Sequence, residues 1–462
     1  MSSLGNISVS SVGQADDTAL ISNNDIHHLF YLFELTKVYC AKNEAELCSE
    51  KTNLQGFIPK KSDLGSLDEV YNPIQISGRS IPFSTTAEHV GIIRSTVSNQ
   101  PTLLSRFSAH KRAVAAVLHS GLALGHRANP VAGIKIHQLY GVPVLLSGLA
   151  ALSLSDSDVD MIERHYCETL RCLVRLLPKT PRSVIYFLAG SLPGTALLHQ
   201  RQLMLFGMIS RLDSNILKQH AVNIFESKTI SAKSWFHHIR QLCLLYGLPH
   251  PLFFLDEPMK KESFKTLVKK RIISYWENQL RLEASTSPSL SFFKPEFMSL
   301  CKPHPLLSSP GSSPSKVSMA IVQATMLSGR YRTQSLLRHW RHNVSGNCLM
   351  APECQSVSED IVHILQQCPG LYSARNKLLY FTSKYCSSLP TDISKLILEL
   401  CHPDHPAFVK FLLDSSSLPQ VIFLVQLSPT PSFTAFFDVS RMWIYVLHRE
   451  RLKRLGQWKH RG

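Results

Sequence analysis

The chain has 462 residues, of which 44% are hydrophobic, and its 49 lysines and arginines exceed its 33 acidic residues, giving a formal net charge of +16. A chain of this length and apolar content can bury sizeable cores, which excludes a disordered polymer and predicts roughly two to four domains. The excess of basic residues predicts a polyanionic partner, either nucleic acid or an anionic membrane surface.

The lengths of the apolar runs and the number of cysteines indicate which kind of partner and which cellular compartment to expect. No run reaches the roughly 18 to 20 apolar residues that a membrane-spanning helix needs, and the amino terminus is polar, so nucleic acid is favoured over a membrane. We expect neither a signal peptide nor a membrane anchor. The 11 cysteines indicate reduced thiols in an intracellular compartment, nuclear or cytoplasmic, where clustered cysteines more often bind metal than form disulfides.

The first expected unit is a β-hairpin followed by a helix. Residues 8–22 alternate small, polar and apolar side chains, which predicts a strand, a turn and a strand. Apolar residues then recur at helical spacing over 24–48, and Asn23 or Asn24 would cap that helix. Further strands are predicted over 49–58 and 71–83.

Two adjacent acids, Asp16 and Asp17, fall in the predicted turn. Like charges at this distance repel each other, so the pair suggests a bound cation. Paired carboxylates hold Mg²⁺ in two-metal phosphoryl-transfer enzymes, since magnesium prefers oxygen ligands. The alternative is a solvated turn that carries two acids and binds no metal.

Helical periodicity dominates from residue 101 onward. It predicts helices over 103–124, 134–152 with a kink or break at Pro143, 156–177, 195–226, 232–246 and 260–283. Residues 285–318 are rich in serine and proline, which predicts a linker or extended loop. The predicted domains are therefore 1–100, a helical region 101–284, the linker 285–318, and a helical module 319–462, in an α+β chain.

The carboxy-terminal module contains a metal-ligand pattern in GNCLMAPECQSVSEDIVHILQQCPG, with spacing C-x5-C-x8-H-x4-C. Three thiols and one imidazole form the closed tetrahedral set of a structural zinc site, in which no position is left for catalysis. We expect the first two thiols on a loop, and the histidine and last cysteine on a short helix opened by Ser358 or Glu359. The alternative is four buried residues without a metal. The predicted zinc ligands are Cys348, Cys354, His363 and Cys368.

A basic and aromatic segment, GRYRTQSLLRHWRHN, precedes this pattern. Arginines neutralise phosphates, and aromatic rings offer faces on which unpaired bases stack. The alternative is a solvated helix whose Leu336, Leu337 and Trp340 dock on the core, and both interpretations can hold together. The predicted nucleic-acid contacts are Arg330, Tyr331, Arg332, Arg338, Trp340 and Arg341. A helix with an apolar start and a basic end is predicted over 441–462, and its basic end either contacts phosphates or is solvated.

The order of these features resembles reverse transcriptases of non-LTR (LINE-type) retrotransposons. In that family an Ala-Asp-Asp hairpin, a Lys-Thr or Lys-Ser pair after a helix, and a His-Leu-Gly-like element belong to the palm. The similar elements here are Ala15-Asp16-Asp17, Lys51-Thr52 and His89-Val90-Gly91. The stretch TPRSVIYFLAGSLPGTALLHQRQLMLFGMI is similar to the family's thumb helices, and the arginine-rich run with its Cys-Cys-His-Cys pattern resembles its zinc-knuckle region.

The resemblance implies roles for three residues. Asp16 and Asp17 would bind Mg²⁺, and Lys51 would lie near the triphosphate, where lysine can act as a general acid; the alternative for Lys51 is a solvated surface lysine. His89 is expected to be a hydrogen-bonded structural histidine.

One departure from the family concerns the palm. Its further metal-binding aspartate and template-positioning motif lie upstream of the hairpin, but only 15 residues precede Asp16. We therefore expect a fragment of an RNA-directed DNA polymerase that is inactive alone unless another chain supplies the missing palm. The alternatives are a non-catalytic RNA- or DNA-binding protein with a zinc knuckle, and a helical scaffold.

Overall fold

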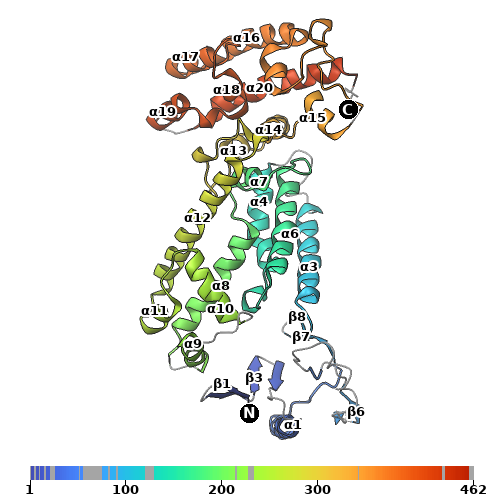
Figure 1. Ribbon diagram of the computed structural model, residues 1–462, viewed down its shortest axis with the longest axis vertical. Coiled ribbons are helices and arrows are strands. Elements are labelled where there is room, and N and C mark those ends of the chain that lie inside the picture. Colours follow the sequence, from blue (N-terminus) through green and yellow to red (C-terminus); the bar gives the residue numbers. More distant parts are fainter. Residues whose placement is uncertain are drawn as a thin grey trace. The chain divides into compact units, whose positions relative to one another are not determined.

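The computed structural model describes most of the chain, and its elements are labelled in Figure 1. The described residues are 2–4, 7–9, 11–14, 17–20, 26–50, 52–55, 75–76, 78–81, 84–89, 92–119, 129–213, 216–226, 234–341, 343–428 and 432–456. The chain divides into two compact units. Unit 1 comprises Met1–Arg112, Pro143–Ile162 and Leu197–Ile272, and unit 2 comprises Ala113–Val142, Glu163–Ala196 and Ile273–Gly462.

The strands are short antiparallel hairpins in unit 1. They are β1 (Ser2–Leu4), β2 (Ile7–Val9), β3 (Ser11–Gln14), β4 (Asp17–Leu20), β5 (Gln75–Ile76), β6 (Arg79–Ser80), β7 (Thr86–His89) and β8 (Ile92–Ser95). Within the described ranges they form two-stranded sheets, β1 with β2, β3 with β4, β5 with β6 and β7 with β8. The predicted hairpin over 8–22 is confirmed by β3 and β4, in which Gln14 pairs with Asp17. No palm sheet is seen among the described strands.

The helix predicted after this hairpin is α1 (Ile26–Lys42), which ends earlier than residue 48. One face of α1 contributes to a small apolar core in unit 1. Phe33 of α1 is buried there with Ile76 and Ile81. The partly buried side chains packed against these three are Leu20, Phe30, Leu47 and Leu54. Hairpins and helix therefore share one core.

Helices make up most of both units. Their bounds are α3 (Gln100–His119), α4 (Pro130–Ile136), α5 (Val142–Leu145), α6 (Asp156–Val174), α7 (Arg182–Ala189), α8 (Gly194–Ser210), α9 (Ile216–Glu226), α10 (Trp235–Leu245), α11 (Pro251–Asp256), α12 (Lys261–Ser285), α13 (Pro305–Ser308), α14 (Pro314–Leu327), α15 (Gln334–Trp340), α16 (Tyr372–Cys386), α17 (Thr391–Leu400), α18 (Phe408–Asp414), α19 (Pro419–Leu427) and α20 (Thr434–Arg454). Short 3-10 turns and two π-helical turns connect some of them. The mixture of many helices with a few short strands agrees with the α+β class.

The helix predicted over 134–152 is not broken at Pro143, and a π-helical turn precedes the proline. A helical path runs from α4 through the π-helical turn η2 (His137–Gly141) into α5, with the Val142 amide bonded to the His137 carbonyl five residues earlier. Proline lacks an amide hydrogen and its ring clashes with the carbonyl four residues before it, here Leu139. The wider π turn accommodates this proline without ending the helix.

In unit 2, α20 is the central helix of the carboxy-terminal part. It packs against α14, α16 and α18, and its Trp443 is fully buried, donating from Nε1 to Thr382 Oγ1 at 2.8 Å. The fully buried Arg441 donates to Asp438 Oδ1 at 2.6 Å and to Ser309 Oγ at 2.8 Å. The apolar start predicted for this helix therefore forms core.

The prediction of a linker over 285–318 is wrong. This stretch contains the 3-10 turns η4 (Pro288–Leu290) and η5 (Pro295–Phe297), then α13 and the start of α14. Most of its apolar side chains, such as Phe293, Leu306 and Leu307, are buried, and the His304 amide donates to the Leu188 carbonyl at 3.1 Å. Several of its prolines stand at helix starts, where the missing amide costs nothing. The predicted boundaries at 285 and 318 thus lie inside unit 2.

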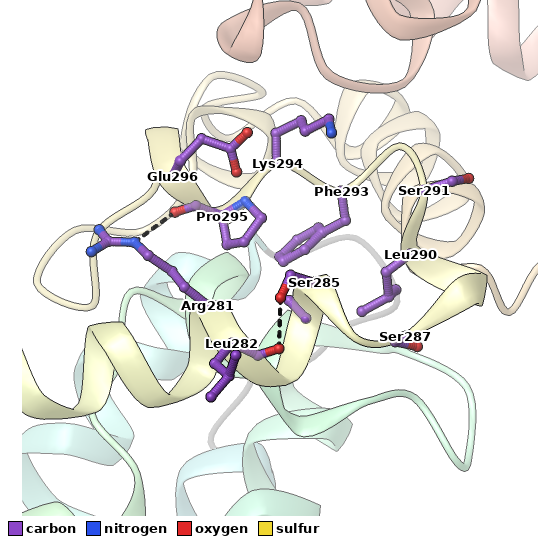
Figure 2. Close-up of a pocket in the computed structure, with 11 residues that line it drawn as sticks. Arg281, Leu282, Ser285, Ser287, Leu290, Ser291, Phe293, Lys294, Pro295 and Glu296 are labelled. Carbon is purple, nitrogen blue, oxygen red and sulfur yellow. Dashed lines mark hydrogen bonds between the residues drawn. The ribbon is translucent and has the colours of Figure 1, made fainter.

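A pocket of about 530 Å³ lies between the end of α12 and this stretch (Figure 2). The Arg281 guanidinium donates to the carbonyls of Pro295 and Met298 at 3.3 and 3.2 Å, so it ties the loop to α12. The other polar lining residues are mostly serines, together with Lys294 and Glu296. This lining provides neither a metal-ligand set nor a nucleophile beside a base.

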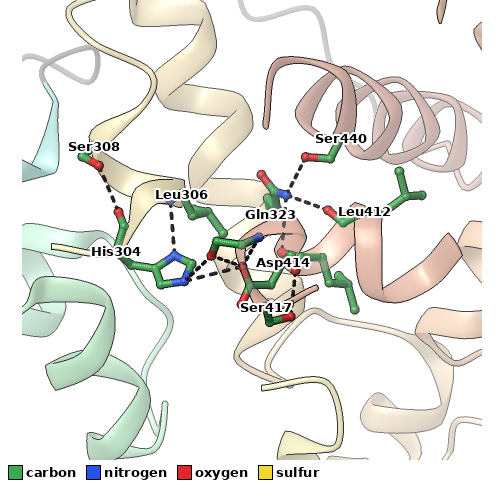
Figure 3. Close-up of polar contacts among 10 residues, drawn as sticks. His304, Leu306, Ser308, Gln323, Leu412, Asp414, Ser417 and Ser440 are labelled. Atoms are coloured by element: carbon green, nitrogen blue, oxygen red, sulfur yellow. Dashed lines mark hydrogen bonds and ion pairs between the residues drawn. The ribbon is translucent and has the colours of Figure 1, made fainter. Parts of the chain in front are cut away.

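Buried polar side chains join α13, α14 and α18 in unit 2 (Figure 3). His304 Nδ1 accepts from the Leu306 amide at 3.2 Å, and its Nε2 lies 3.5 Å from Asp414 Oδ1. Ser416 Oγ donates to Asp414 Oδ1 at 2.6 Å. Ser416 Oγ also lies 3.2 Å from His304 Nε2. Because the serine and the carboxylate face the same ring nitrogen and His304 Nδ1 accepts from the backbone, the group links helices and lacks the relay order of a nucleophilic triad.

Among the described residues, no single helix has the length and apolar composition to cross a membrane. One bent pair, Phe408–Ser417 with Pro419–Leu427 at 44°, meets the two criteria together.

Candidate metal centre

The four predicted ligands come together in unit 2. Every pair of their candidate ligand atoms lies within 4.8 Å, and all four side chains are buried. The Sγ atoms of Cys348 and Cys368 are 3.8 Å apart, which is about the sulfur–sulfur separation in a tetrahedron with zinc–sulfur bonds of about 2.3 Å. The predicted cluster is therefore present as a closed Cys3His set that can hold one metal ion such as zinc.

A tight β-like loop positions the first two cysteines, and we call residues 346–359 the metal hairpin. Its two ends pair through the Asn347–Ser358 bridge, and the Cys348 amide donates to the Val357 carbonyl at 2.9 Å. Gly346 has a φ of +83°, a conformation that side chains other than glycine rarely adopt. Cys354 ends the 3-10 turn η6 (Pro352–Cys354), which directs its thiol back toward the cluster.

The other two ligands bracket a short helical turn. The Asp360 carboxylate accepts the His363 amide at 2.7 Å, so Asp360 caps the turn where Ser358 or Glu359 was expected. The π-helical turn η7 (His363–Gln367) then brings Cys368 back, with its amide donating to the His363 carbonyl at 2.7 Å. Arg375 Nη2 donates to the Cys368 carbonyl at 2.6 Å and fixes the chain after the last ligand.

The imidazole of His363 is the strongest sign of a ligand. The side chain is 3% exposed, and neither ring nitrogen has a hydrogen-bond partner among the described residues. A buried polar group without a partner is destabilising by roughly 1 to 3 kcal/mol, and such groups are rare in folded proteins. Coordination of one ring nitrogen would remove part of this cost.

Burial sets the protonation state of three of the four ligands. Burial raises the pKa of Cys348 to about 12 and raises that of Cys368, so without a cation both thiols stay protonated at neutral pH. Burial also lowers the pKa of His363, which keeps the imidazole neutral, as a metal ligand must be. The Met350 amide lies 3.5 Å from Cys348 Sγ and favours its thiolate form.

The basic and aromatic segment lies next to the metal hairpin and divides into an inner and an outer side. Tyr331 is only 7% exposed, its hydroxyl is 2.7 Å from His448 Nδ1, and the Arg451 guanidinium lies 5.3 Å from its ring centroid. The prediction that Tyr331 stacks on bases is therefore wrong. This ring packs inward, because its face is already occupied by a cation.

The outer side keeps most of the predicted contacts accessible. Trp340 is 44% exposed at the end of α15. Exposed with it are Arg332, Arg338 and Arg341, and Arg330 is half-buried. Leu336 and Leu337 are half-buried, so the docked helix and the exposed cations occur together.

The predicted polymerase residues are not placed by the structure. Asp16 and Lys51 lie outside the described residues, as do the side chains of Asp17 and His89. Only the backbone of Asp17 is described, as the first residue of β4.

The chain matches no protein-family model, no curated protein and no solved structure. The function is therefore argued from the site itself.

The pairing of two buried residues of this region, Glu359 and Arg451, was not predicted. Glu359 is fully buried and Arg451 is 3% exposed, and they form an ion pair of 2.5 Å between the metal hairpin and α20. They are 92 positions apart, and each stands in a stretch rich in polar residues. Neither periodicity nor spacing therefore indicated that they meet.

Proposed function

We propose that the chain binds RNA or DNA through a carboxy-terminal module stabilised by one structural zinc ion. The observation that carries the zinc proposal is the buried Cys3His cluster, whose histidine nitrogens have no hydrogen-bond partner in the described part of the chain. A bound zinc ion would supply the positive charge that keeps buried thiolates ionised. With four protein ligands no coordination position remains for substrate, so the role is structural.

The nucleic-acid proposal rests on the outer side of the arginine-rich segment. Arg332, Arg338 and Arg341 are exposed residues, and none has an ion-pair partner in the described part of the chain. Trp340 stands among them with an accessible ring. Cations that contact phosphates beside a ring that stacks on a base are the combination used for single strands.

Two triple variants test this surface. Arg332, Arg338 and Arg341 changed to alanine should weaken RNA binding and reduce the slope of log affinity against log salt by about 2, because each phosphate contact contributes about 0.7 on single strands. The matched control changes Lys265, Lys269 and Arg271, exposed cations of α12, and removes the same charge. Equal effects of the two variants on affinity and slope would show that net charge alone binds RNA.

A second proposal concerns the family. We propose that the chain is the carboxy-terminal portion of a non-LTR reverse transcriptase, with Mg²⁺ held at Asp16 and Asp17. The order of β3, β4 and the following α1 supports it, since the resembling palm has a hairpin followed by a helix. The helical region after residue 100 is in keeping with a thumb.

Primer extension on an RNA template with Mg²⁺ tests the polymerase proposal. Extension that the Asp16→Ala, Asp17→Ala double variant loses would support catalysis at these carboxylates, with or without a second chain completing the palm. RNA binding that survives the double mutation while no extension occurs would leave only the binding function.

A further inference from the structure

The start of helix α15 is held by one residue of the metal hairpin, Glu359, through its carboxylate and its backbone carbonyl. The Gln334 amide donates to Glu359 Oε1 at 2.9 Å, and the Ser335 amide donates to the Glu359 carbonyl at 3.2 Å. Thr333 Oγ1 accepts the Leu336 amide at 3.1 Å. The first amides of a helix have no partner inside it, so Glu359 provides partners for two that would otherwise be unsatisfied.

The same carboxylate is paired with a buried cation. Arg451 Nη2 lies 2.5 Å from Glu359 Oε1 and also donates to the Arg332 carbonyl at 3.0 Å. The Arg451 guanidinium covers the ring of Tyr331 as well. Glu359 and Arg451 together therefore fix the chain that leads into α15 and its first turn.

Glu359 is in turn held by the metal hairpin. Its amide donates to the Gly346 carbonyl at 3.0 Å, beside the Asn347–Ser358 bridge and four positions before His363. A Cβ on Gly346 would lie 2.9 Å from Arg338 Cδ, so the stem of this arginine passes directly over the hairpin. The metal ligands, Glu359 and α15 thus form one continuous packed unit.

We propose that Glu359 is a positioning residue that docks α15 on the metal hairpin, so that single-stranded nucleic acid binds tightly only when the metal site is filled. This inference rests on the proposed nucleic-acid function. A helix of seven residues is unstable by itself in water. Without the contacts to Glu359, α15 therefore holds Arg338, Trp340 and Arg341 in the binding arrangement for only a fraction of the time. The apparent affinity for nucleic acid is the intrinsic affinity multiplied by that fraction.

Glu359→Ala tests the docking, and Asp414→Ala is the matched control. Both remove a fully buried carboxylate that is paired with a cationic or titratable side chain in unit 2. Asp414 contacts His304 and neighbouring serines and makes no contact with α15. Glu359→Gln is the conservative variant, because its amide oxygen can still accept from the Gln334 amide.

Three quantities are measured on the full-length variants, and affinities refer to the folded fraction. They are bound zinc per chain, amide hydrogen exchange at Gln334 and Ser335, and affinity for a fluorescent 20-nucleotide single-stranded RNA. We expect Glu359→Ala to keep one zinc, to exchange these two amides faster, and to bind RNA roughly tenfold more weakly. Glu359→Gln should be intermediate, and Asp414→Ala should match the unchanged protein in all three.

Several results would overturn the inference. Wild-type exchange and RNA affinity in Glu359→Ala would show that Glu359 does not position α15, and loss of zinc in Glu359→Gln would make it a residue of the metal site instead. If Asp414→Ala weakened RNA binding equally, the loss in Glu359→Ala would be explained by a general loss of stability. If the unchanged protein binds no RNA, the proposed function fails, and hydrogen exchange with and without zinc still decides whether Glu359 docks α15.

Discussion

Replacement of one metal ligand by an atom of similar size should separate coordination from packing. Cys368→Ser keeps the backbone carbonyl that accepts from Arg375 and replaces only the buried sulfur, 3.8 Å from Cys348 Sγ. A serine hydroxyl does not ionise at neutral pH and is a poor zinc ligand. Structural zinc contributes roughly 12 kcal/mol of binding free energy, so one ligand of four accounts for about 3 kcal/mol. The zinc affinity should fall roughly a hundred-fold.

The assay is competition for zinc against a chromophoric chelator, followed by thermal unfolding of the zinc-loaded protein. A loss of about 3 kcal/mol corresponds to a Tm lower by roughly 6 to 12 °C for a unit of this size. The control is Cys386→Ser, which makes the same change at a buried cysteine of α16 outside the cluster. Undiminished zinc affinity in Cys368→Ser, or an equal loss in Cys386→Ser, would refute the assignment of Cys368 as a ligand.

Three further predictions concern close packing, a buried histidine and the thiols. Gly190→Ala should destabilise unit 2 by about 3 kcal/mol in urea unfolding, because φ is +60° and the new Cβ would lie 2.1 Å from the Lys302 backbone. The control Gly247→Ala has a similar φ of +61° but no neighbour within 4 Å, so it should cost only about 1 kcal/mol. Equal losses of stability in the two variants would contradict the packing of the 285–318 stretch. Burial, and then the charge of His238, lowers the pKa of His199 from 6.5 to about 3. As the pH drops below 6.5 the unfolded chain is therefore protonated at His199 before the folded protein, and the free energy of unfolding falls by about 1.4 kcal/mol per pH unit. His199→Gln should flatten the dependence of Tm on pH, and an unchanged slope would show that the buried His199 is not its cause. Zinc affinity should rise with pH between 6 and 8, because protons compete with zinc for the three sulfurs and the imidazole. An affinity that does not change with pH in the chelator assay would argue against thiolate coordination.

The metal cluster could be predicted because its ligands lie close together in the sequence. Four ligands within 21 consecutive residues, 348–368, need only a hairpin and one helical turn to meet, and both are short-range structures. The β3–β4 hairpin and α1 were predictable for the same reason, since alternation and helical periodicity are properties of short windows.

The errors share a physical cause, which is long-range packing. Serine and proline content suggested an extended stretch at 285–318, but Leu306 and Leu307 within it are buried in unit 2. Tyr331 has the chemistry of a stacking residue, but its partners His448 and Arg451 lie more than 100 positions away. Residue type shows what a side chain can do, and only the tertiary structure shows which side it faces.

The most direct test of the proposed function is RNA affinity as a function of salt, measured by fluorescence anisotropy on zinc-loaded and metal-free protein. The account predicts that zinc-loaded protein binds single-stranded RNA with a log–log salt slope of at least about 2 in magnitude, from three exposed arginines. It also predicts that metal-free protein binds roughly tenfold more weakly, with recovery on adding back zinc. Equal affinity and slope with and without zinc, or no salt-dependent RNA binding at all, would contradict it.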